Sequence, residues 1–560
     1  MPNYNTNSNQ SSCDECNHST ATERTALLTS QSRSEATEAN DAPGAQDPEA
    51  ATTGELPSMK LILILSTTWI GVFLGAIDST IISTLSAPIS SEFRSLSLLS
   101  WLATAYLIAN AACQPISGRL TDIFGRGPGL CFCNISFAAG NLICGLAKDQ
   151  YVMILGRVVA GVGGGGLISI ATFLASDLVP LRRRGLIQGI LNIWYGLGAM
   201  TGGIFGGFVH DNFALGWRLA FLIQVPPAVL SALAVFFLVR IPPKQSDKSF
   251  IARIDFIGLF LICFSVVILL LGLNSGGNLV PWTHPLPLIT IPLSIATFTA
   301  FIWWEDQIAE PIIPVRILAD RTITAACFTS LFTTMAFMAS IFYVPLYLQV
   351  LGNTATTTAV KMLSAPVGLS VASLSTGFIT KSTGQYVGVG IAGQLAFILG
   401  AALFSFQNGR DPVWLTTVAF ALVGGGFGAM LTTTLLACVA ALDHAQQAVV
   451  TSIMSTLVTV RSLGGTVGIT MASVIYQNTC QAQLWERFGS EPDAANEIRR
   501  IRNDLDELRR LPKGWHDGVM ESLIAAFCNV WMMMLVLAVM AFICMALIKQ
   551  HKLHSTLDRR

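Results

Sequence analysis

Long runs of apolar residues dominate this 560-residue chain and restrict what it can fold into. The segment Ile257–Leu273, for example, contains no charged residue. Such runs are continuous rather than alternating, which excludes the strands of a membrane β-barrel. Only 12% of the residues are charged, against about 25% in an average soluble chain. We therefore expect an all-α protein whose helices cross a membrane.

Fourteen segments are long and apolar enough to be predicted as spanning helices. They lie at about 61–84, 97–117, 129–147, 151–176, 186–209, 217–239, 255–273, 284–304, 322–350, 357–380, 386–406, 412–440, 446–475 and 523–548. The first six form a predicted bundle over 61–239, and the last six form a second bundle over 322–548. Two extra spans lie in the linker 240–321, and 549–560 is a short tail.

The distribution of lysine and arginine in the short loops predicts the orientation. Most of these residues fall on one side, among them Arg126, Arg182–Arg184 and Arg240. Cytoplasmic loops carry such an excess of positive charge. Because the number of predicted spans is even, both termini are expected in the cytoplasm.

The N-terminal segment 1–58 is rich in Ser, Thr, Asn, Gln and Ala and is predicted to be disordered. Within it, Glu23 precedes Leu27 and Leu28 with the spacing of an acidic dileucine sorting signal. Such a signal is read by sorting adaptors that route proteins to the vacuole or lysosome. The alternative is a chance match.

A second segment outside the predicted spans has helical periodicity. Apolar residues recur from Ile498 to Leu511 at helical spacing, and Pro512 follows them. We predict an amphipathic helix near 493–511 on the lumenal side. It either caps the ends of the spans or serves as a ligand-binding lid.

Several functional classes are excluded by motifs and charge. The net charge is zero and no basic stripe is present, so nucleic acid is not an expected partner. Gly161–Gly166 matches G-x-G-x-x-G, but an apolar helix surrounds it, which does not fit a dinucleotide site. No G-x-x-x-x-G-K-[ST] phosphate-binding motif occurs, so an ATP-driven pump is not expected.

The cysteines form neither a disulfide framework nor a clear metal site. We expect no cofactor, no metal, no catalytic residue and no enzyme activity, and we expect any transport to use an ion gradient.

An internal repeat relates the two predicted bundles. Gly118 and Gly125 in the loop after the second span correspond to Gly377 and Gly384 in the second bundle. The glycine run of the fourth span also recurs near Gly424. Two homologous bundles are typical of a transporter with a site between the repeats. The charges of the first loop are not repeated in the second.

Three charged residues lie within predicted spans: Asp78, Arg157 and Arg461. Intramembrane charges are costly and usually functional, and each of these shares a helix face with glycines that favour close packing against protein. Asp78 is the candidate for binding a proton or a cationic substrate. Arg157 is interpreted as its counter-ion or as a proton-relay neighbour, and a permanent structural pair is the alternative. Arg461 is interpreted as a structural residue near a gate.

The loop residues Gly118, Asp122, Gly125 and Arg126 resemble the signature of the major facilitator superfamily. The predicted spans, counted as six, two and six, resemble its fourteen-span drug:proton antiporter branch. The segment from Leu74 to Ile82 is similar to the first-span motif of that branch. Within the branch, the dileucine and the pairing of Asp78 with a glycine run most resemble fungal vacuolar basic amino-acid transporters.

This resemblance implies roles for further residues. It implies a cytoplasmic latch in which Asp122 faces a helix N-terminus of the second bundle and Arg126 pairs with an acid, for which we select Asp177. The antiporter motif of span five normally includes a proline, which is absent here. Its positions are Gly198, Gly202, Gly203, Gly206 and Gly207. The run formed by Arg461, Gly464, Gly465 and Gly468 is similar to the eleventh-span motif of the branch.

The function implied by the resemblance is proton-coupled antiport by alternating access. The expected substrates are basic amino acids, moved from the cytosol into the vacuole. The first alternative is efflux of drugs or toxins across the plasma membrane. The second alternative is a nutrient receptor that binds its ligand without transporting it.

Overall fold

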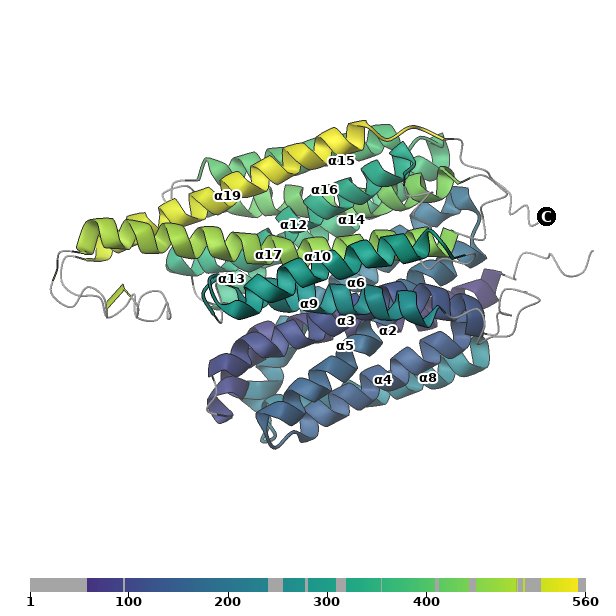
Figure 1. Cartoon of the computed structure of the whole chain (residues 1–560), viewed down its shortest axis with the longest axis horizontal. Coiled ribbons are helices and arrows are strands. Elements are labelled where there is room, and N and C mark those ends of the chain that lie inside the picture. Colours follow the sequence, from purple (N-terminus) through teal and green to yellow (C-terminus); the bar gives the residue numbers. More distant parts are fainter. Residues whose placement is uncertain are drawn as a thin grey trace, which may run out of the picture. The chain divides into compact units, whose positions relative to one another are not determined.

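The computed structural model describes most of the chain from residue 58 onward. The described residues are 58–93, 96–239, 255–276, 280–308, 319–353, 355–407, 412–442, 450–489, 491, 497–498 and 515–551. The sorting signal at Glu23, Leu27 and Leu28 lies outside them, as does most of the predicted helix near 493–511. Every named element in the described part is an α-helix (Figure 1).

The helices of the first bundle follow the predicted spans closely. They are α2 (Ser58–Glu92), α3 (Leu96–Phe124), α4 (Arg126–Leu146), α5 (Gln150–Leu178), α6 (Leu181–Asn212), α7 (Trp217–Leu222) and α8 (Val225–Leu238). The linker helices are α9 (Phe256–Ser275) and α10 (Pro285–Glu305). They pack against each other, and α9 also contacts α3 and α17 (Figure 1).

The second bundle repeats the packing of the first. Its helices are α12 (Arg321–Val350), α13 (Ala355–Met362), α14 (Ser364–Thr383), α15 (Val387–Ser405), α16 (Val413–Ala440), α17 (Val450–Phe488) and α19 (His516–Ala546). In the first bundle α2 packs on α6, α3 on α5, and α4 on α5 and α8. In the second bundle α12 packs on α17, α14 on α16, and α15 on α16 and α19, which is the same pattern. The two bundles meet mainly where α6 packs on α14 and α3 packs on α17.

Two predicted spans are interrupted in the structure. The segment predicted over 217–239 forms α7 and α8, which are separated at Ile223 and Gln224. The segment predicted over 357–380 forms α13 and α14. Proline lacks a backbone N–H and is favoured in the first turn of a helix, where that N–H would have no partner in the helix. Pro226 and Pro366 occupy such positions in α8 and α14. Proline alone does not break these helices, because Pro115 and Pro345 lie inside α3 and α12.

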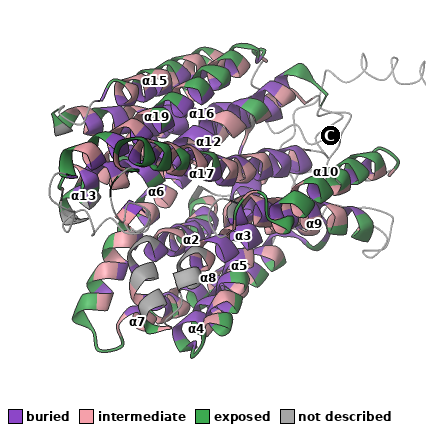
Figure 2. Cartoon of the chain, turned by 60° about the vertical axis from the view of Figure 1, so that its left-hand side comes forward, coloured by how far each residue is buried: buried purple, intermediate pink, exposed green. Residues whose placement is uncertain are grey.

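Twelve described segments are long and apolar enough to cross a membrane. The other two predicted spans, 97–117 and 186–209, are helical as α3 and α6 but are more polar, so a count of fourteen stays a prediction. Large apolar residues such as Phe132, Phe236 and Trp303 are exposed on the outer helix faces. Figure 2 shows exposed residues along α10 and buried residues where helices meet. This distribution suits a lipid environment, in which the outer faces are apolar too.

Candidate functional site

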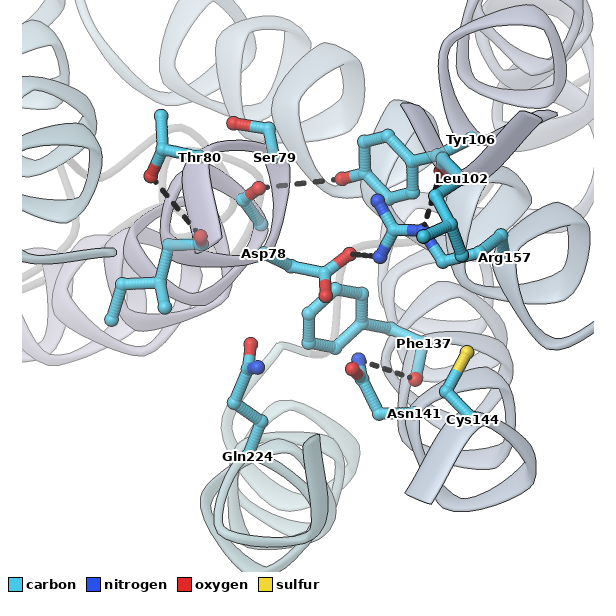
Figure 3. Close-up of polar contacts among 12 residues, drawn as sticks. Asp78, Ser79, Thr80, Leu102, Tyr106, Phe137, Asn141, Cys144, Arg157 and Gln224 are labelled. Carbon is cyan, nitrogen blue, oxygen red and sulfur yellow. Dashed lines mark hydrogen bonds and ion pairs between the residues drawn. The ribbon is translucent and has the colours of Figure 1, made fainter. Parts of the chain in front are cut away.

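Asp78 and Arg157 form a buried ion pair inside the first bundle. Asp78 lies on α2 and Arg157 on α5, and Arg157 Nη1 is 2.8 Å from Asp78 Oδ2 (Figure 3). The Asp78 side chain is 0% exposed and that of Arg157 is 1% exposed. Arg157 Nε also donates a hydrogen bond to the Leu102 carbonyl oxygen at 3.0 Å. A pair shielded in this way from water and salt interacts strongly and is costly to break.

Tyr106 and two glycines hold this pair in place. The Arg157 guanidinium lies over the Tyr106 ring, 4.4 Å from its centre. The Tyr106 hydroxyl donates a hydrogen bond to the Gly75 carbonyl oxygen at 3.3 Å (Figure 3). A side chain at Gly164 would collide with the Tyr106 hydroxyl. The glycine run of α5 therefore makes room for the aromatic ring that supports Arg157.

Two buried amides accompany Asp78. Asn141 on α4 and Gln224 at the junction of α7 and α8 point toward it in Figure 3. The sequence did not single out Asn141, and Gln224 was predicted only as one of several polar residues that either line the cavity or form an interhelical hydrogen bond. An amide in the middle of the apolar run 129–147 was the available signal for Asn141, and the proline-linked helix break was the signal for Gln224.

Arg126 lies at the centre of a second polar cluster. This cluster is at the end of the first bundle where the signature loop joins α3 to α4. Its Nη2 lies 2.6 Å from Asp122 Oδ1, and its Nε lies 2.8 Å from Asp177 Oδ2. Its Nη2 also donates a hydrogen bond to Thr451 Oγ1, at 2.8 Å. Thr451 lies in the first turn of α17, so this arginine connects the two bundles. The structure thus pairs Arg126 with Asp177, as the sequence predicted, while the role of this cluster as a latch stays a prediction.

The loop glycines adopt a backbone conformation that few other residues reach. Gly125, before α4, has a φ of 98°, and Gly384, after α14, has a φ of 73°. Positive φ values are costly for residues with a Cβ. Both halves of the repeat therefore need glycine at this turn, although only the first half has the charges of the signature.

Further contacts close the two bundles together near this end. Ser462 Oγ of α17 donates a hydrogen bond to Gln114 Oε1 of α3 at 2.6 Å. Asn192 Nδ2 of α6 donates one to Ser373 Oγ of α14 at 2.8 Å. A Cβ atom at Gly377 would lie 2.5 Å from the Gly185 carbonyl oxygen. The structure is therefore of a conformation in which the end marked by Arg126 is closed.

The remaining glycine motifs pack helices within each bundle. Gly198 and Gly202 of α6 lie against the backbone of α2 at Phe73 and Ile77. The other three glycines of this motif are not packed alike. Gly203 is half-buried and Gly206 is buried, whereas nothing lies within 4 Å of a Cβ at Gly207. Gly464, Gly465 and Gly468 of α17 lie against α12. Gly161–Gly166 lies inside α5, not at a strand-to-helix turn.

Arg461 lies on α17 between the bundles and is half-buried. Tyr195 of α6, in the other bundle, lies within electrostatic range of it. No ion pair with Arg461 occurs among the residues that the structure describes. The described residues also include no group of three His, Cys, Asp or Glu side chains that could hold a metal ion.

Comparisons with known proteins agree with this architecture. The chain is 35% identical to "Multidrug resistance protein fnx1" of Schizosaccharomyces pombe over 520 residues, which cover 91% of this chain and 97% of the relative. It is 30% identical to "Vacuolar basic amino acid transporter 2" of Saccharomyces cerevisiae over 450 residues, covering 77% of this chain and 93% of the relative.

A solved structure and a family model extend the comparison. The structure of the proton:xylose symporter XylE matches with a TM-score of 0.55 and 12% identity, covering 86% of this chain and 95% of that chain. This likeness concerns the fold alone. The sequence model of the major facilitator superfamily matches residues 68–469. The predicted family resemblance is confirmed, and the chain is an integral membrane transporter that belongs to the major facilitator superfamily.

Proposed function

We propose that this protein is a proton-coupled antiporter with fourteen spans that moves basic amino acids from the cytosol into the vacuole by alternating access. The observation that carries the proposal is the buried pair of Asp78 and Arg157. Asp78 is a fully buried carboxylate in the second half of the candidate span Met59–Ile82. Antiport needs a negative charge for which a proton and a cationic substrate compete, and Asp78 supplies it.

The direction of transport follows from the proposed topology. With both termini in the cytoplasm, the Arg126 cluster closes the cytosolic end. Asp78 is buried in the conformation described here, so exchange with the lumen requires the opposite end to open. A proton from the acidic lumen then binds Asp78 and releases the substrate. Reopening of the cytosolic end requires Arg126 to leave Thr451, which makes this cluster the gate.

A test of the proposal compares substrates that differ in one group. Purified protein is reconstituted in vesicles with an acidic interior, and uptake of labelled arginine, lysine and histidine is measured with and without a proton uncoupler. Agmatine, which is arginine without its carboxyl group, and a lipophilic cation are tested in parallel. We expect uptake of the amino acids that the uncoupler abolishes. Uptake of the lipophilic cation alone would support the rival function, drug or toxin efflux, which the multidrug-resistance relative also favours. Binding of arginine without uptake would support the receptor alternative.

Vacuolar localisation has its own test. We propose that Glu23, Leu27 and Leu28 form an adaptor-read sorting signal. The double variant Leu27→Ala and Leu28→Ala should move tagged protein from the vacuolar membrane to the plasma membrane while uptake activity in vesicles is kept. Tagged double variant that stays at the vacuole would rule the signal out.

A further inference from the structure

Three buried oxygen atoms around Asp78 have no hydrogen-bond donor among the residues that the structure describes. They are Asp78 Oδ1, Asn141 Oδ1 and Gln224 Oε1. Asp78 and Asn141 are 0% exposed and Gln224 is 2% exposed. Figure 3 shows both amide groups on the side of the carboxyl group that Arg157 does not occupy. Buried acceptors are almost always paired, so an unpaired set of three needs an explanation.

The nitrogen atoms of both amides are already occupied by hydrogen bonds. Asn141 Nδ2 donates a hydrogen bond to the Phe137 carbonyl oxygen at 3.1 Å. Gln224 Nε2 donates one to the Ala220 carbonyl oxygen, also at 3.1 Å. Each amide is therefore held by its own helix with the oxygen free. An ionised carboxylate has acceptors only, whereas a protonated one gains a donor.

The other groups near Asp78 do not supply that donor. Its electrostatic partners in the described part of the chain are Arg157 of α5, Tyr106 of α3 and Cys144 of α4. Arg157 bonds to Oδ2, the Tyr106 hydroxyl bonds to the Gly75 oxygen, and the Cys144 thiol bonds to the Met153 oxygen. A bound metal cation fits poorly, because three oxygens are few for a hard cation and the Arg157 charge would repel it.

We propose that Asn141 and Gln224 complete a proton-binding site with Asp78, an inference that rests on the proton coupling proposed above. A proton from the lumenal side bonds to Asp78 Oδ1 and gives a neutral carboxylic acid. The new O–H group donates a hydrogen bond to the amide oxygen of Asn141 or Gln224, while Arg157 keeps its bond to Oδ2. On release the O–H bond breaks, its electron pair stays on the carboxylate, and the proton passes to water on the cytosolic side. Asn141 and Gln224 are thus positioning residues.

The test uses the full chain in vesicles and the variants Asn141→Leu and Gln224→Met, which remove one acceptor each at similar side-chain size. Asn134→Leu is the matched control. Asn134 lies two turns earlier on α4 and also bonds through its nitrogen to the carbonyl oxygen four residues before it, at 2.9 Å. Its oxygen is likewise buried and without a partner among the described residues, but it lies near Gly71 rather than Asp78.

Two quantities are measured: the lumenal pH of half-maximal arginine uptake, and the infrared C=O stretch of the protonated Asp78, identified by its loss in Asp78→Asn.

Each acceptor variant should move the half-maximal pH to more acidic values by about 0.5–1 unit, which corresponds to one hydrogen bond. The C=O stretch should move to higher wavenumber, because a weaker hydrogen bond leaves a stiffer carbonyl. Asn134→Leu should change neither quantity. Wild-type pH dependence and wild-type stretch in the two acceptor variants would overturn the inference and leave the proton coupling intact. If one of the two acceptor variants does not fold, the other still tests whether an amide oxygen accepts a hydrogen bond from protonated Asp78. Uptake in Asp78→Asn that still follows the pH gradient would overturn the coupling and this inference together.

Discussion

Arg157 Nη1 lies 2.8 Å from Asp78 Oδ2, in a pair whose side chains are almost completely buried. The pair joins α2, which packs mainly on α6, to α5, which packs mainly on α3 and α4. Charge at this point therefore affects both the chemistry of the site and the packing of the helices around it. The first two predictions separate these effects.

Asp78→Asn should abolish proton-driven uptake. Asparagine keeps the size of the side chain and accepts a hydrogen bond from Arg157, but it carries no exchangeable acid proton. The protein should still reach its membrane, because Arg157 keeps its contacts with Leu102 and Tyr106. Asp78→Glu should retain partial uptake with an altered pH optimum. The measurement is uptake after a pH jump in reconstituted vesicles, and a wild-type rate in Asp78→Asn would mean that Asp78 is structural.

Arg157→Lys should weaken the first bundle although the positive charge is kept. The ammonium group is a point charge and does not reproduce the planar fork that contacts Asp78, Leu102 and the Tyr106 ring together. We expect a loss of about 1–3 kcal/mol in unfolding free energy, seen as a lower melting temperature of the purified protein. Arg183→Lys on the exposed side of α6 is the control and should melt like wild type. Equal melting temperatures of both variants would argue against a structural contribution of the fork.

Asp122→Asn should slow transport and leave substrate binding unchanged. The substitution keeps the shape but removes the charge that holds Arg126 at 2.6 Å. Loss of an interaction of about 0.3–2 kcal/mol corresponds to a reduction in turnover of about 2- to 30-fold. Turnover is measured as maximal uptake per copy of protein, and binding is measured separately with labelled arginine. Unchanged maximal velocity at equal expression would exclude the latch.

Gly377→Ala should open the end of the structure that Arg126 closes. A methyl group there would lie 2.5 Å from the Gly185 carbonyl oxygen, and backbone atoms give way less easily than a flexible side chain. We expect cysteine probes placed near Thr432 to react faster with a thiol reagent in this variant. Gly388→Ala is the control, because nothing lies within 4 Å of its Cβ position. Identical labelling rates in the two variants would show that the close approach of α6 and α14 does not control opening.

Glu92→Gln should lower stability at neutral pH by about 0.2–1 kcal/mol, since the pair is partly exposed and screened by water. Partial burial raises the pKa of Glu92, but hydrogen bonds from Arg218 and Trp217 and the Arg218 charge outweigh it, so the pKa lies below its usual value. A depressed folded-state pKa gives stability that is present above the unfolded value and is lost as the pH falls through the folded value. The melting temperatures of wild type and variant should therefore converge below about pH 4. The more exposed pair of Arg487 and Glu521 provides the comparison, and Glu521→Gln should have a smaller effect.

The sequence alone determined the helices and the charged centre of the site. Long apolar runs have few alternatives in a membrane, because every backbone polar group must be satisfied within the helix. Charges within such runs are rare, so Asp78 and Arg157 could be selected as partners without knowledge of the fold. The pairing of Arg126 with Asp177 was predicted from the family resemblance, which implies that Arg126 pairs with a nearby acid. Asp177 was selected because it lies in the next loop on the same side.

Only the tertiary structure decided which neutral groups surround Asp78. Asn141 and Gln224 come from different helices, and an isolated intramembrane amide is usually an interhelical hydrogen bond, so hydropathy does not distinguish them from other polar residues. The packing of α4 on α8 places both amides on one side of Asp78, as Figure 3 shows. The closure of the two bundles has the same origin. It depends on contacts such as Gly377 with Gly185, where two helices distant in sequence approach because neither residue has a side chain to keep them apart.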